Sequence, residues 1–305
     1  MPEPAISLVG LTKYYGHELG VADITFEVFP GETVGFLGPN GAGKTTSMRS
    51  LVGLLNITSG SARIFGEKVS VRSFEMRSRI GYLPGAPTFY QNLTAKEHLS
   101  FLAKMRNARC ANEIDSLAER LELDLSRRVH DLSKGNQQKV GVIQALMHRP
   151  DVLILDEPTS GLDPIVQREF AVIIDECKSR GAAILLSSHV LSEVEHLADR
   201  VVILNLGKQI LVDDIRHLKE KAVRTVDLFF HDLVDDKEFV GISGVSEVFG
   251  YGTRITCKIV GSENALFAKA VQMGLESVQS HESGLDEIFF SIVDGGESSD
   301  NAVTA

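Results

Sequence analysis

Residues 38–46 of the chain read Gly38-Pro39-Asn40-Gly41-Ala42-Gly43-Lys44-Thr45-Thr46. This segment matches the pattern G-x-x-x-x-G-K-[ST], whose backbone N–H groups converge on phosphate oxygens. The apolar run Thr33–Leu37 before it predicts a strand, and Thr45–Leu55 after it predicts a helix. Because a helix N-terminus adds positive potential, a glycine-rich turn between a strand and a helix is suited to bind nucleotide phosphates.

The residue types in this turn have separate expected tasks. Lys44 is expected to reach the β- and γ-phosphates, and the hydroxyl of Thr45 is expected to ligate Mg²⁺. Gly38, Gly41 and Gly43 allow the backbone to approach the phosphates without a Cβ clash.

A second signal is the segment Val152–Glu157, an apolar strand that ends in two carboxylates. A carboxylate at the end of a buried strand beside the glycine-rich turn is placed to hold Mg²⁺, directly or through water, and this residue is Asp156. The next carboxylate, Glu157, can polarise a water molecule for in-line attack on the γ-phosphate. The two signals together predict an enzyme that hydrolyses a nucleoside triphosphate.

A third signal is the segment Leu132-Ser133-Lys134-Gly135-Asn136-Gln137-Gln138. Ser133 is a suitable N-cap for a helix that runs on to Met147. A serine hydroxyl, a glycine backbone and a helix N-terminus make another anion site. One γ-phosphate does not need two such loops from one chain.

The order of these motifs resembles that of the ATP-binding subunits of ABC transporters, over residues 5 to about 212. The matching elements follow one another as in that family: an aromatic residue, the glycine-rich turn, a signature, an acidic strand, the run Ser160-Gly161-Leu162-Asp163, and His189. The resemblance implies a head-to-tail dimer with two ATP molecules between the subunits. In such a dimer the signature residues Ser133, Lys134, Gly135 and Asn136 contact the ATP of the partner, which gives the second anion site a use.

The resemblance also implies tasks for single residues. Tyr15 matches the aromatic residue that stacks on adenine, and since stacking tolerates any base, ATP is expected over GTP because of its abundance in cells. Asp163 matches a loop that communicates across the dimer. His189 matches the histidine that contacts the γ-phosphate.

Composition excludes several classes of protein. The chain has 305 residues and a net charge of −10 without a basic run, which argues against nucleic-acid binding. Its cysteines, Cys110, Cys177 and Cys257, form no C-x-x-C pair and are expected to be thiols in a reducing cytosol. No apolar run approaches the ~20 residues that span a bilayer, and Met1–Pro4 does not begin a signal peptide. We expect a soluble cytoplasmic chain, bound to the inner face of the cell membrane through a permease.

The predicted fold is α/β, with strands separated by helices, as in a sheet that is covered on both faces. The family resemblance implies a P-loop NTPase of ABC type, with a mixed sheet core, an antiparallel β subdomain and a helical subdomain at about residues 90–147. We place this domain at residues 1–222 and include in it a linker helix at Ile215–Ala222.

Residues 223–293 are expected to form a small α+β domain, followed by a disordered tail at residues 294–305. Its predicted order, β-α-β-β-α-β, is that of a ferredoxin-like unit. The ending Gly284–Phe289 resembles the accessory domain of ABC-2 type ATPases, which is expected to contribute to dimerisation or gating. The predicted elements are strands at Val226–Phe230, Val245–Phe249, Arg254–Ile259 and Glu276–Ser280 and helices at Asp236–Val240, Ser262–Met273 and Leu285–Val293.

Two positions depart from the family's usual pattern. The signature reads Leu-Ser-Lys-Gly-Asn where many members have Leu-Ser-Gly-Gly-Gln, a variant that resembles the ABC-2 exporter branch. After Ile80–Pro84 the family usually has a glutamine that helps to ligate Mg²⁺, and here the residue is Gly85. Water can replace that ligand, and we expect slower hydrolysis and looser coupling; Gln91 in the same loop is the alternative ligand.

Apolar residues flank this loop, and two interpretations of them stay open. They line a groove that receives a short helix of a membrane subunit, or they pack inside the domain between its two lobes. The residues are Phe74, Met76, Phe89 and Tyr90.

Three functions remain in competition. The first is the ATP-hydrolysing subunit of an ABC exporter, with a permease as partner and a dimer with itself or with a paralogue. The second is a non-transport ABC ATPase of DNA repair or translation, against which the acidic charge and the lack of insertions argue. The third is a regulatory module that binds ATP but hydrolyses it weakly. The presence of Glu157 and His189 argues against it, and Gly85 leaves it open.

Overall fold

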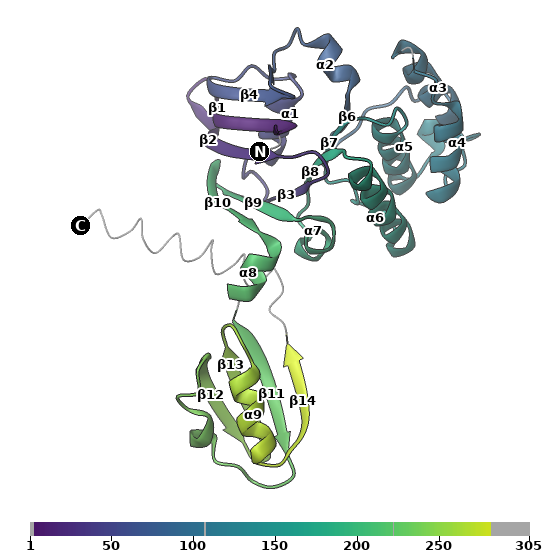
Figure 1. The fold of residues 1–305 in the computed structure, drawn as a ribbon. Coiled ribbons are helices and arrows are strands. Elements are labelled where there is room, and N and C mark those ends of the chain that lie inside the picture. The colour runs from purple at the N-terminus through teal and green to yellow at the C-terminus, as the bar shows by residue number, and fades with distance from the viewer. Residues whose placement is uncertain (1–2, 107, 222, 282–305) are drawn as a thin grey trace. The chain divides into compact units, whose positions relative to one another are not determined.

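The computed structural model describes residues 3–106, 108–221 and 223–281 (Figure 1). The chain forms two compact units, which part between Val212 and Asp213. Each unit is described here by itself.

The N-terminal unit is built on a mixed sheet. Its ten strands lie in the order β5-β4-β1-β2-β10-β9-β3-β8-β7-β6. The end with β5, β4, β1 and β2 is antiparallel, whereas β9, β3, β8, β7 and β6 run parallel. The predicted mixed sheet with an antiparallel part is therefore confirmed. The strands are β1 (Ile6–Tyr15), β2 (Glu18–Val28), β3 (Thr33–Leu37), β4 (Ser59–Ile64), β5 (Glu67–Lys68), β6 (Ile80–Leu83), β7 (Val152–Asp156), β8 (Ala183–Ser187), β9 (Arg200–Asn205) and β10 (Lys208–Asp214).

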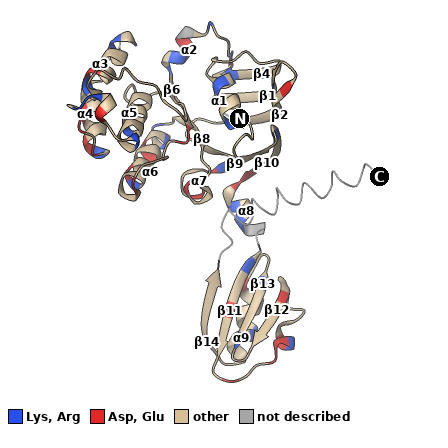
Figure 2. Cartoon of the chain, turned by 180° about the vertical axis from the view of Figure 1, so that it is seen from behind, with Lys and Arg blue, Asp and Glu red and all other residues tan. Residues whose placement is uncertain are grey.

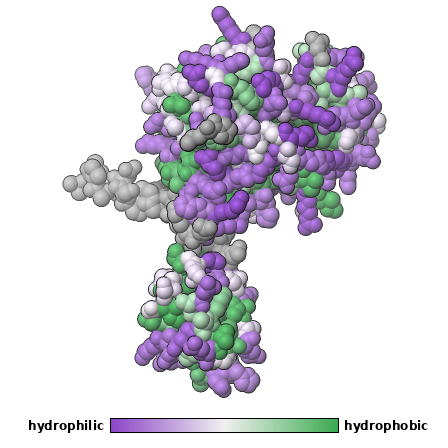
Figure 3. Space-filling model, in the orientation of Figure 1, coloured by the Kyte–Doolittle hydropathy of each residue, from purple (hydrophilic) through white to green (hydrophobic). Residues whose placement is uncertain are grey.

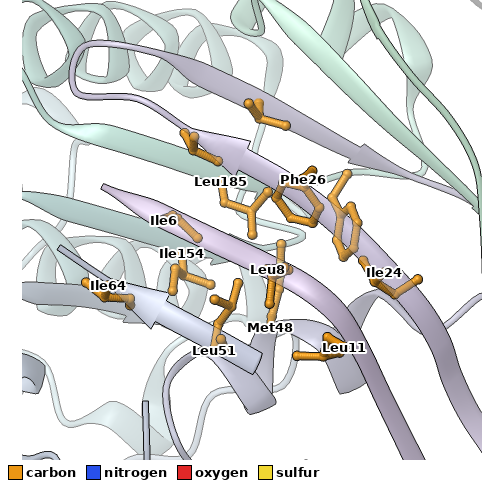
Figure 4. Close-up of a cluster of buried hydrophobic side chains, with 14 of the residues drawn as sticks. Ile6, Leu8, Leu11, Ile24, Phe26, Met48, Leu51, Ile64, Ile154 and Leu185 are labelled. Carbon is orange, nitrogen blue, oxygen red and sulfur yellow. The ribbon is translucent and has the colours of Figure 1, made fainter. Parts of the chain in front are cut away.

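The three central parallel strands are buried along their whole length. Every residue of β3, β7 and β8 is buried, which is the expected consequence of covering both faces of a parallel sheet. Residues from β1, β2, β4 and helix α1 complete an extended apolar cluster, part of which is drawn in Figure 4. This cluster supports the end of β3 from which the glycine-rich turn emerges.

Helices surround the sheet and form a separate helical part. Helix α1 ends at Leu51 instead of the predicted Leu55, because Val52 and Gly53 leave the helical conformation and Gly53 takes a φ of 69°. Helix α3 begins with a capping box in which Thr94 accepts from the backbone of Glu97. The helices of this unit are α1 (Lys44–Leu51), α2 (Phe74–Ser78), α3 (Ala95–Met105), α4 (Ala111–Arg120), η1 (Val129–Asp131), α5 (Lys134–Leu146), α6 (Pro164–Ser179) and α7 (Leu191–Leu197).

The C-terminal unit holds a smaller antiparallel sheet with the strand order β12-β13-β11-β14. The four predicted strands are present, but the helix predicted at Asp236–Val240 is wrong. These residues form a single 3₁₀ turn, whose Phe239 is buried beside Phe230 with ring centroids 5.7 Å apart. The ferredoxin-like assignment stays a prediction. The elements are α8 (Ile215–Lys221), β11 (Arg224–Phe230), η2 (Asp236–Phe239), β12 (Val245–Tyr251), β13 (Arg254–Ile259), α9 (Asn264–Gln272) and β14 (Leu275–His281).

The structure bears differently on the expectations for the C-terminal end, the thiols and membrane-spanning segments. The helix predicted at Leu285–Val293 and the tail at residues 294–305 lie outside the described residues. The predicted thiols Cys110, Cys177 and Cys257 are free and buried. None of the helices in the described ranges is both long and apolar enough to cross a bilayer.

The surface of the N-terminal unit carries charges of both signs. Lys and Arg alternate with Asp and Glu over helices α3, α4 and α6 (Figure 2). Hydrophilic residues prevail on the face of this unit that is drawn in Figure 3. The apolar side chains are therefore concentrated in the core that positions the glycine-rich turn.

We expect the core around β8 to determine the stability of the N-terminal unit. Leu185 is 0% exposed, and Leu185→Ala should lower the free energy of unfolding by about 2–5 kcal/mol, because it leaves a cavity in a close-packed region. Leu54→Ala, at a residue that is 57% exposed, is the control and should change it by less than about 0.5 kcal/mol. Equal effects of the two variants in urea unfolding would contradict the assignment.

Candidate functional site

The glycine-rich turn lines a cavity of about 380 Å³ at the carboxyl end of β3. The predicted nucleotide residues Pro39 to Thr46 meet there with Tyr15 and with the carboxylates Asp156 and Glu157. Residues far apart in the sequence are thus brought to one site, as the motif order predicts. The cavity is lined by Tyr15, Glu18, Leu19, Gly20, Pro39, Asn40, Gly41, Ala42, Gly43, Lys44, Thr45, Thr46, Gly85, Asp156 and Glu157.

Glycine is required at two positions of the turn. Gly43 has a φ of 101°, and a Cβ there would lie 2.2 Å from Cγ1 of Val21. Gly38 has a φ of 155°, and a Cβ there would lie 2.5 Å from the carbonyl oxygen of Leu204. Any other residue would be strained in conformation and would collide with the neighbouring strands. The turn can keep this backbone conformation only with glycine at these positions.

The ammonium of Lys44 is held inside the turn. Its Nζ donates to the carbonyl oxygens of Gly38 at 2.5 Å and Pro39 at 3.3 Å. Burial lowers the pKa of Lys44, while the charges of Glu157 and Asp156 act in the opposite direction. The two nearby carboxylates therefore favour the charged form of Lys44 and partly offset the effect of burial on its pKa.

Asp156 is a buried carboxylate, with only 2% of its surface exposed. Its side chain accepts one hydrogen bond from the Thr45 hydroxyl at 2.7 Å and one from the Ser187 hydroxyl at 2.6 Å. Hydroxyl and carboxylate oxygens are the ligands that suit Mg²⁺. Thr45 and Asp156, which the sequence predicts as Mg²⁺ ligands, are thus adjacent and chemically suited to hold that ion.

Glu157 adopts an unusual backbone conformation, with a φ of 53°. A non-glycine residue in this region costs about 1–3 kcal/mol, and such strain gathers at functional sites. The N–H of Glu157 donates to the carbonyl oxygen of Ser187 at 3.2 Å and to its hydroxyl at 3.1 Å. The strained backbone is therefore anchored to the end of β8.

The carboxylate of Glu157 is paired with His189. Nδ1 of His189 lies 2.5 Å from Oε2 of Glu157. Because a carboxylate only accepts, Nδ1 carries the proton of this hydrogen bond. The predicted histidine and the predicted base thus form one pair, and Glu157 lies on the cavity wall.

Tyr15 lies at the edge of the cavity and is half exposed. Its hydroxyl is 3.4 Å from Oγ1 of Thr46, and Nζ of Lys13 lies 5.2 Å from the ring centroid. An exposed aromatic ring beside a phosphate-binding turn can stack on a base.

The signature residues do not line this cavity. Ser133 caps α5, since its hydroxyl accepts from the N–H of Asn136 at 3.3 Å. Ser133 and Lys134 are exposed, and Gly135 and Asn136 are partly exposed. The signature is therefore formed and accessible, but it is separate from the phosphate cavity of its own chain.

Asp163 caps helix α6. Its Oδ1 accepts from the N–H groups of Ile165 at 3.1 Å and Val166 at 3.0 Å. The N–H of Val166 is the main cause of a lowered pKa for the Asp163 carboxyl. The residue therefore stays ionised and ordered beside the loop 157–162.

Two residues of the site were missed from the sequence. Ser187 pairs with Asp156 in the parallel register of β8 and β7, and its signal is a hydroxyl at the end of an apolar strand. Gln138 donates to the loop that follows β7; its position one turn into α5 is visible in the sequence, but its partners are not.

Gly85 lies on the cavity wall next to Asp156. A Cβ at this position would be 3.3 Å from Oδ2 of Asp156, and the φ of Gly85 is outside the left-handed region. The backbone conformation is therefore open to other residues, but a Cβ would be in tight contact with the carboxylate, which must shift by a few tenths of an ångström. The rest of a side chain here would extend beside that carboxylate. Gln91 does not line the cavity, and its carbonyl oxygen is bonded to His130.

Comparisons with known proteins identify the family of the chain. Residues 21–160 match the family described as ABC transporter. The chain is 36% identical over 301 residues to the bacitracin transport ATP-binding protein BcrA of Bacillus licheniformis, which covers 95% of this chain and 98% of that protein. It is 37% identical over 215 residues to the Nod factor export ATP-binding protein I of Paraburkholderia xenovorans (strain LB400), covering 69% of this chain and 71% of the relative.

A solved structure described as the ATP binding subunit of an ABC transporter also matches. It covers 70% of this chain and 92% of its own, with a TM-score of 0.66 and 32% sequence identity. The chain belongs to the family of ABC transporter ATP-binding proteins.

We expect Gly85→Gln to accelerate ATP hydrolysis about three- to tenfold, because it adds an oxygen ligand beside Asp156 where ligand-shell changes commonly alter activity by tenfold or more. Initial rates as a function of Mg²⁺ concentration measure the effect, and half-saturation should need less Mg²⁺.

Gly85→Ala is the matched control, since it adds the same Cβ without an oxygen. Its rate should not exceed that of the unchanged protein. If Gly85→Gln leaves the rate of ATP hydrolysis unchanged, both for the chain alone and with a membrane partner, the expectation is contradicted.

Proposed function

We propose that this chain is the ATP-hydrolysing subunit of an ABC-type membrane exporter. The observation that carries the proposal is the pairing of Glu157 with His189 at the cavity that also holds Lys44, Thr45 and Asp156. A phosphate-binding turn, a pair of Mg²⁺ ligands and an oriented carboxylate at one cavity are the parts that nucleotide hydrolysis needs.

The residues divide the work as follows. The turn from Gly38 to Thr46 binds the phosphates with its N–H groups and with Lys44, and Tyr15 stacks on adenine. Thr45 and Asp156 would hold Mg²⁺, which supplies positive charge to the β- and γ-phosphate oxygens.

Glu157 accepts a proton from the attacking water as the new oxygen–phosphorus bond forms and the bond to the ADP oxygen breaks. His189 orients the Glu157 carboxylate through Nδ1, and its remaining ring edge is free to approach the γ-phosphate. The products are ADP and inorganic phosphate.

ATP also joins two subunits head to tail in this proposal. The accessible signature at Ser133–Asn136 offers a hydroxyl, a cation and a helix N-terminus, yet it does not line the cavity of its own chain. A second subunit that brings its signature to the γ-phosphate would give these groups a ligand. Asp163, held at the start of α6, lies in the loop that would communicate across this dimer.

The direction of transport and the membrane partner are inferred from the relatives. One of them is named for export and another for transport of bacitracin. We infer that the chain works at the inner face of the cell membrane, bound to a permease. Two copies of this chain, or this chain and a paralogue, would form the dimer.

A hollow beside α3 is the surface that we assign to the permease. It has a volume of about 410 Å³ and lies between α2, α3 and α5. Leu102 and the largely exposed Met105 supply its apolar lining. Outside the hollow, the ring of the exposed Tyr90 packs edge-on against the ring of Phe101, 5.4 Å away. Such apolar groups suit a short amphipathic helix. The hollow is lined by Arg77, Ser78, Leu102, Met105, Arg106 and Gln144.

The four apolar residues considered from the sequence fall into different environments. Met76 is buried in the main core and is thus internal packing. Phe89 packs against His98, with ring centroids 5.4 Å apart, whereas Tyr90 is exposed. The side chain of Phe74 lies outside the described residues.

We expect Glu157→Gln to abolish most hydrolysis and to retain ATP-bound dimers. Loss of a general base lowers rates about 10²- to 10⁴-fold, while ATP and the signature still meet. Analytical ultracentrifugation with and without ATP and Mg²⁺ measures the dimer. A variant that hydrolyses ATP normally, or that stays monomeric with ATP, would overturn the mechanism.

We expect Arg106→Glu to weaken the permease complex at least tenfold. Within the described residues no carboxylate forms a salt bridge with Arg106, which donates to the carbonyl oxygen of Arg77 and contacts His148. A carboxylate of the permease would form an ion pair with Arg106, and this charged hydrogen bond would contribute ~1.5–3 kcal/mol to the binding free energy. Lys104→Glu, on an exposed neighbour outside the hollow, is the control. Co-purification of the tagged chain with a polytopic membrane protein measures the loss, and equal retention in both variants would contradict the placement.

A further inference from the structure

Helix α5 and the loop that follows β7 are joined by one buried side chain. Gln138 is 7% exposed, and its Nε2 donates to the carbonyl oxygen of Glu157 at 3.0 Å and to that of Pro158 at 3.1 Å. A buried amide that satisfies two carbonyl oxygens holds both peptide groups in place. The link begins two residues after the signature Ser133–Asn136 and ends on the residue that we assign as the base.

A second contact joins the same two segments. A Cβ at Gly135 would lie 2.5 Å from the carbonyl oxygen of Gly161. The N-terminal turn of α5 therefore touches the 157–161 loop both at Gly135 and at Gln138. A displacement of the signature cannot leave this loop where it was, because the contact has no free space.

The backbone of Glu157 is held from two sides. Its N–H is bonded to Ser187 at the end of β8, and its carbonyl oxygen is bonded to Gln138. Between these two bonds the residue keeps its positive φ of 53°. A strained conformation persists only where its surroundings determine it, and Gln138 is one of the two supports.

We propose that Gln138 is a positioning residue that couples the two ATP sites of the dimer. This inference rests on the proposed function. The signature of a subunit meets the ATP of its partner, whereas Glu157 of the same subunit acts on its own ATP. When the signature is held by the partner's ATP, Gln138 fixes the position of Glu157 in the same subunit. Each site therefore reaches its full rate of hydrolysis only when the other holds ATP.

The test compares hydrolysis as a function of ATP concentration for the full-length protein and its Gln138 variants. Gln138→Leu removes the donors. Gln138→Glu keeps the shape and removes the donors when ionised, and its protonated form restores one donor. Gln137→Leu is the matched control, because the amide of Gln137 donates to the carbonyl oxygens of Val129 and Leu132 and not to the 157–161 loop.

We expect both Gln138 variants to lose about 100-fold in kcat, the usual effect of a misplaced reacting group. Their Hill coefficient should fall from about two to about one, since two coupled sites become independent. Binding of a fluorescent ATP analogue should not change. Because burial raises the pKa of an introduced carboxyl, the rate of Gln138→Glu relative to the unchanged protein should recover between about pH 8 and about pH 6.

Gln138 variants that keep the Hill coefficient and kcat of the unchanged protein would overturn the inference, as would an equal loss of cooperativity in Gln137→Leu. If Gln138→Leu does not fold, the pH-dependent recovery of Gln138→Glu decides alone. If the protein without substitutions forms dimers in the presence of ATP but has a Hill coefficient of about one, only the coupling is refuted. An unchanged protein that neither pairs nor hydrolyses ATP refutes the proposed function itself.

Discussion

A buried carboxylate, Asp156, joins the segments on which the site is built. It ends β7, accepts from Thr45 at the start of α1 and accepts from Ser187 at the end of β8. A charge that is only 2% exposed must be hydrogen-bonded, because its transfer from water is otherwise very costly. The positions of the glycine-rich turn and of both strand ends therefore depend on one another.

The same constraint extends to Glu157. Ser187 contacts both residues, since its hydroxyl donates to the carboxylate of Asp156 and accepts from the backbone N–H of Glu157. The next peptide group is held by Gln138 from α5. The proposed Mg²⁺ ligand, the proposed base and helix α5 are thus connected through a few hydrogen bonds, and this connection is the physical basis for treating them as one unit.

Some parts of the fold followed from local pattern, and others did not. The strands at the centre of the sheet are uninterrupted apolar runs, and the caps at Ser133 and Asp163 are visible in the sequence, so these elements were predicted. The early end of α1 and the 3₁₀ turn at Asp236–Phe239 were not, because glycine conformation at Gly53 and packing of Phe239 override local helix preference. The burial of Met76 also depended on the tertiary core, because the sequence pattern of an apolar residue beside a loop fits a surface groove as well as internal packing.

The sequence by itself determined the chemistry of this protein. The order and spacing of the glycine-rich turn, the acidic strand end, the signature and His189 indicate which groups are candidates to bind phosphate and to activate a water molecule, because these tasks demand particular residue types. Only the tertiary structure decided which groups touch. The register of β7 and β8 places Ser187 against Asp156, and the packing of α5 places Gln138 against Glu157. Such contacts join residues about 20 to 30 positions apart along the chain, and they arise from how buried surfaces fit together, which no local pattern encodes.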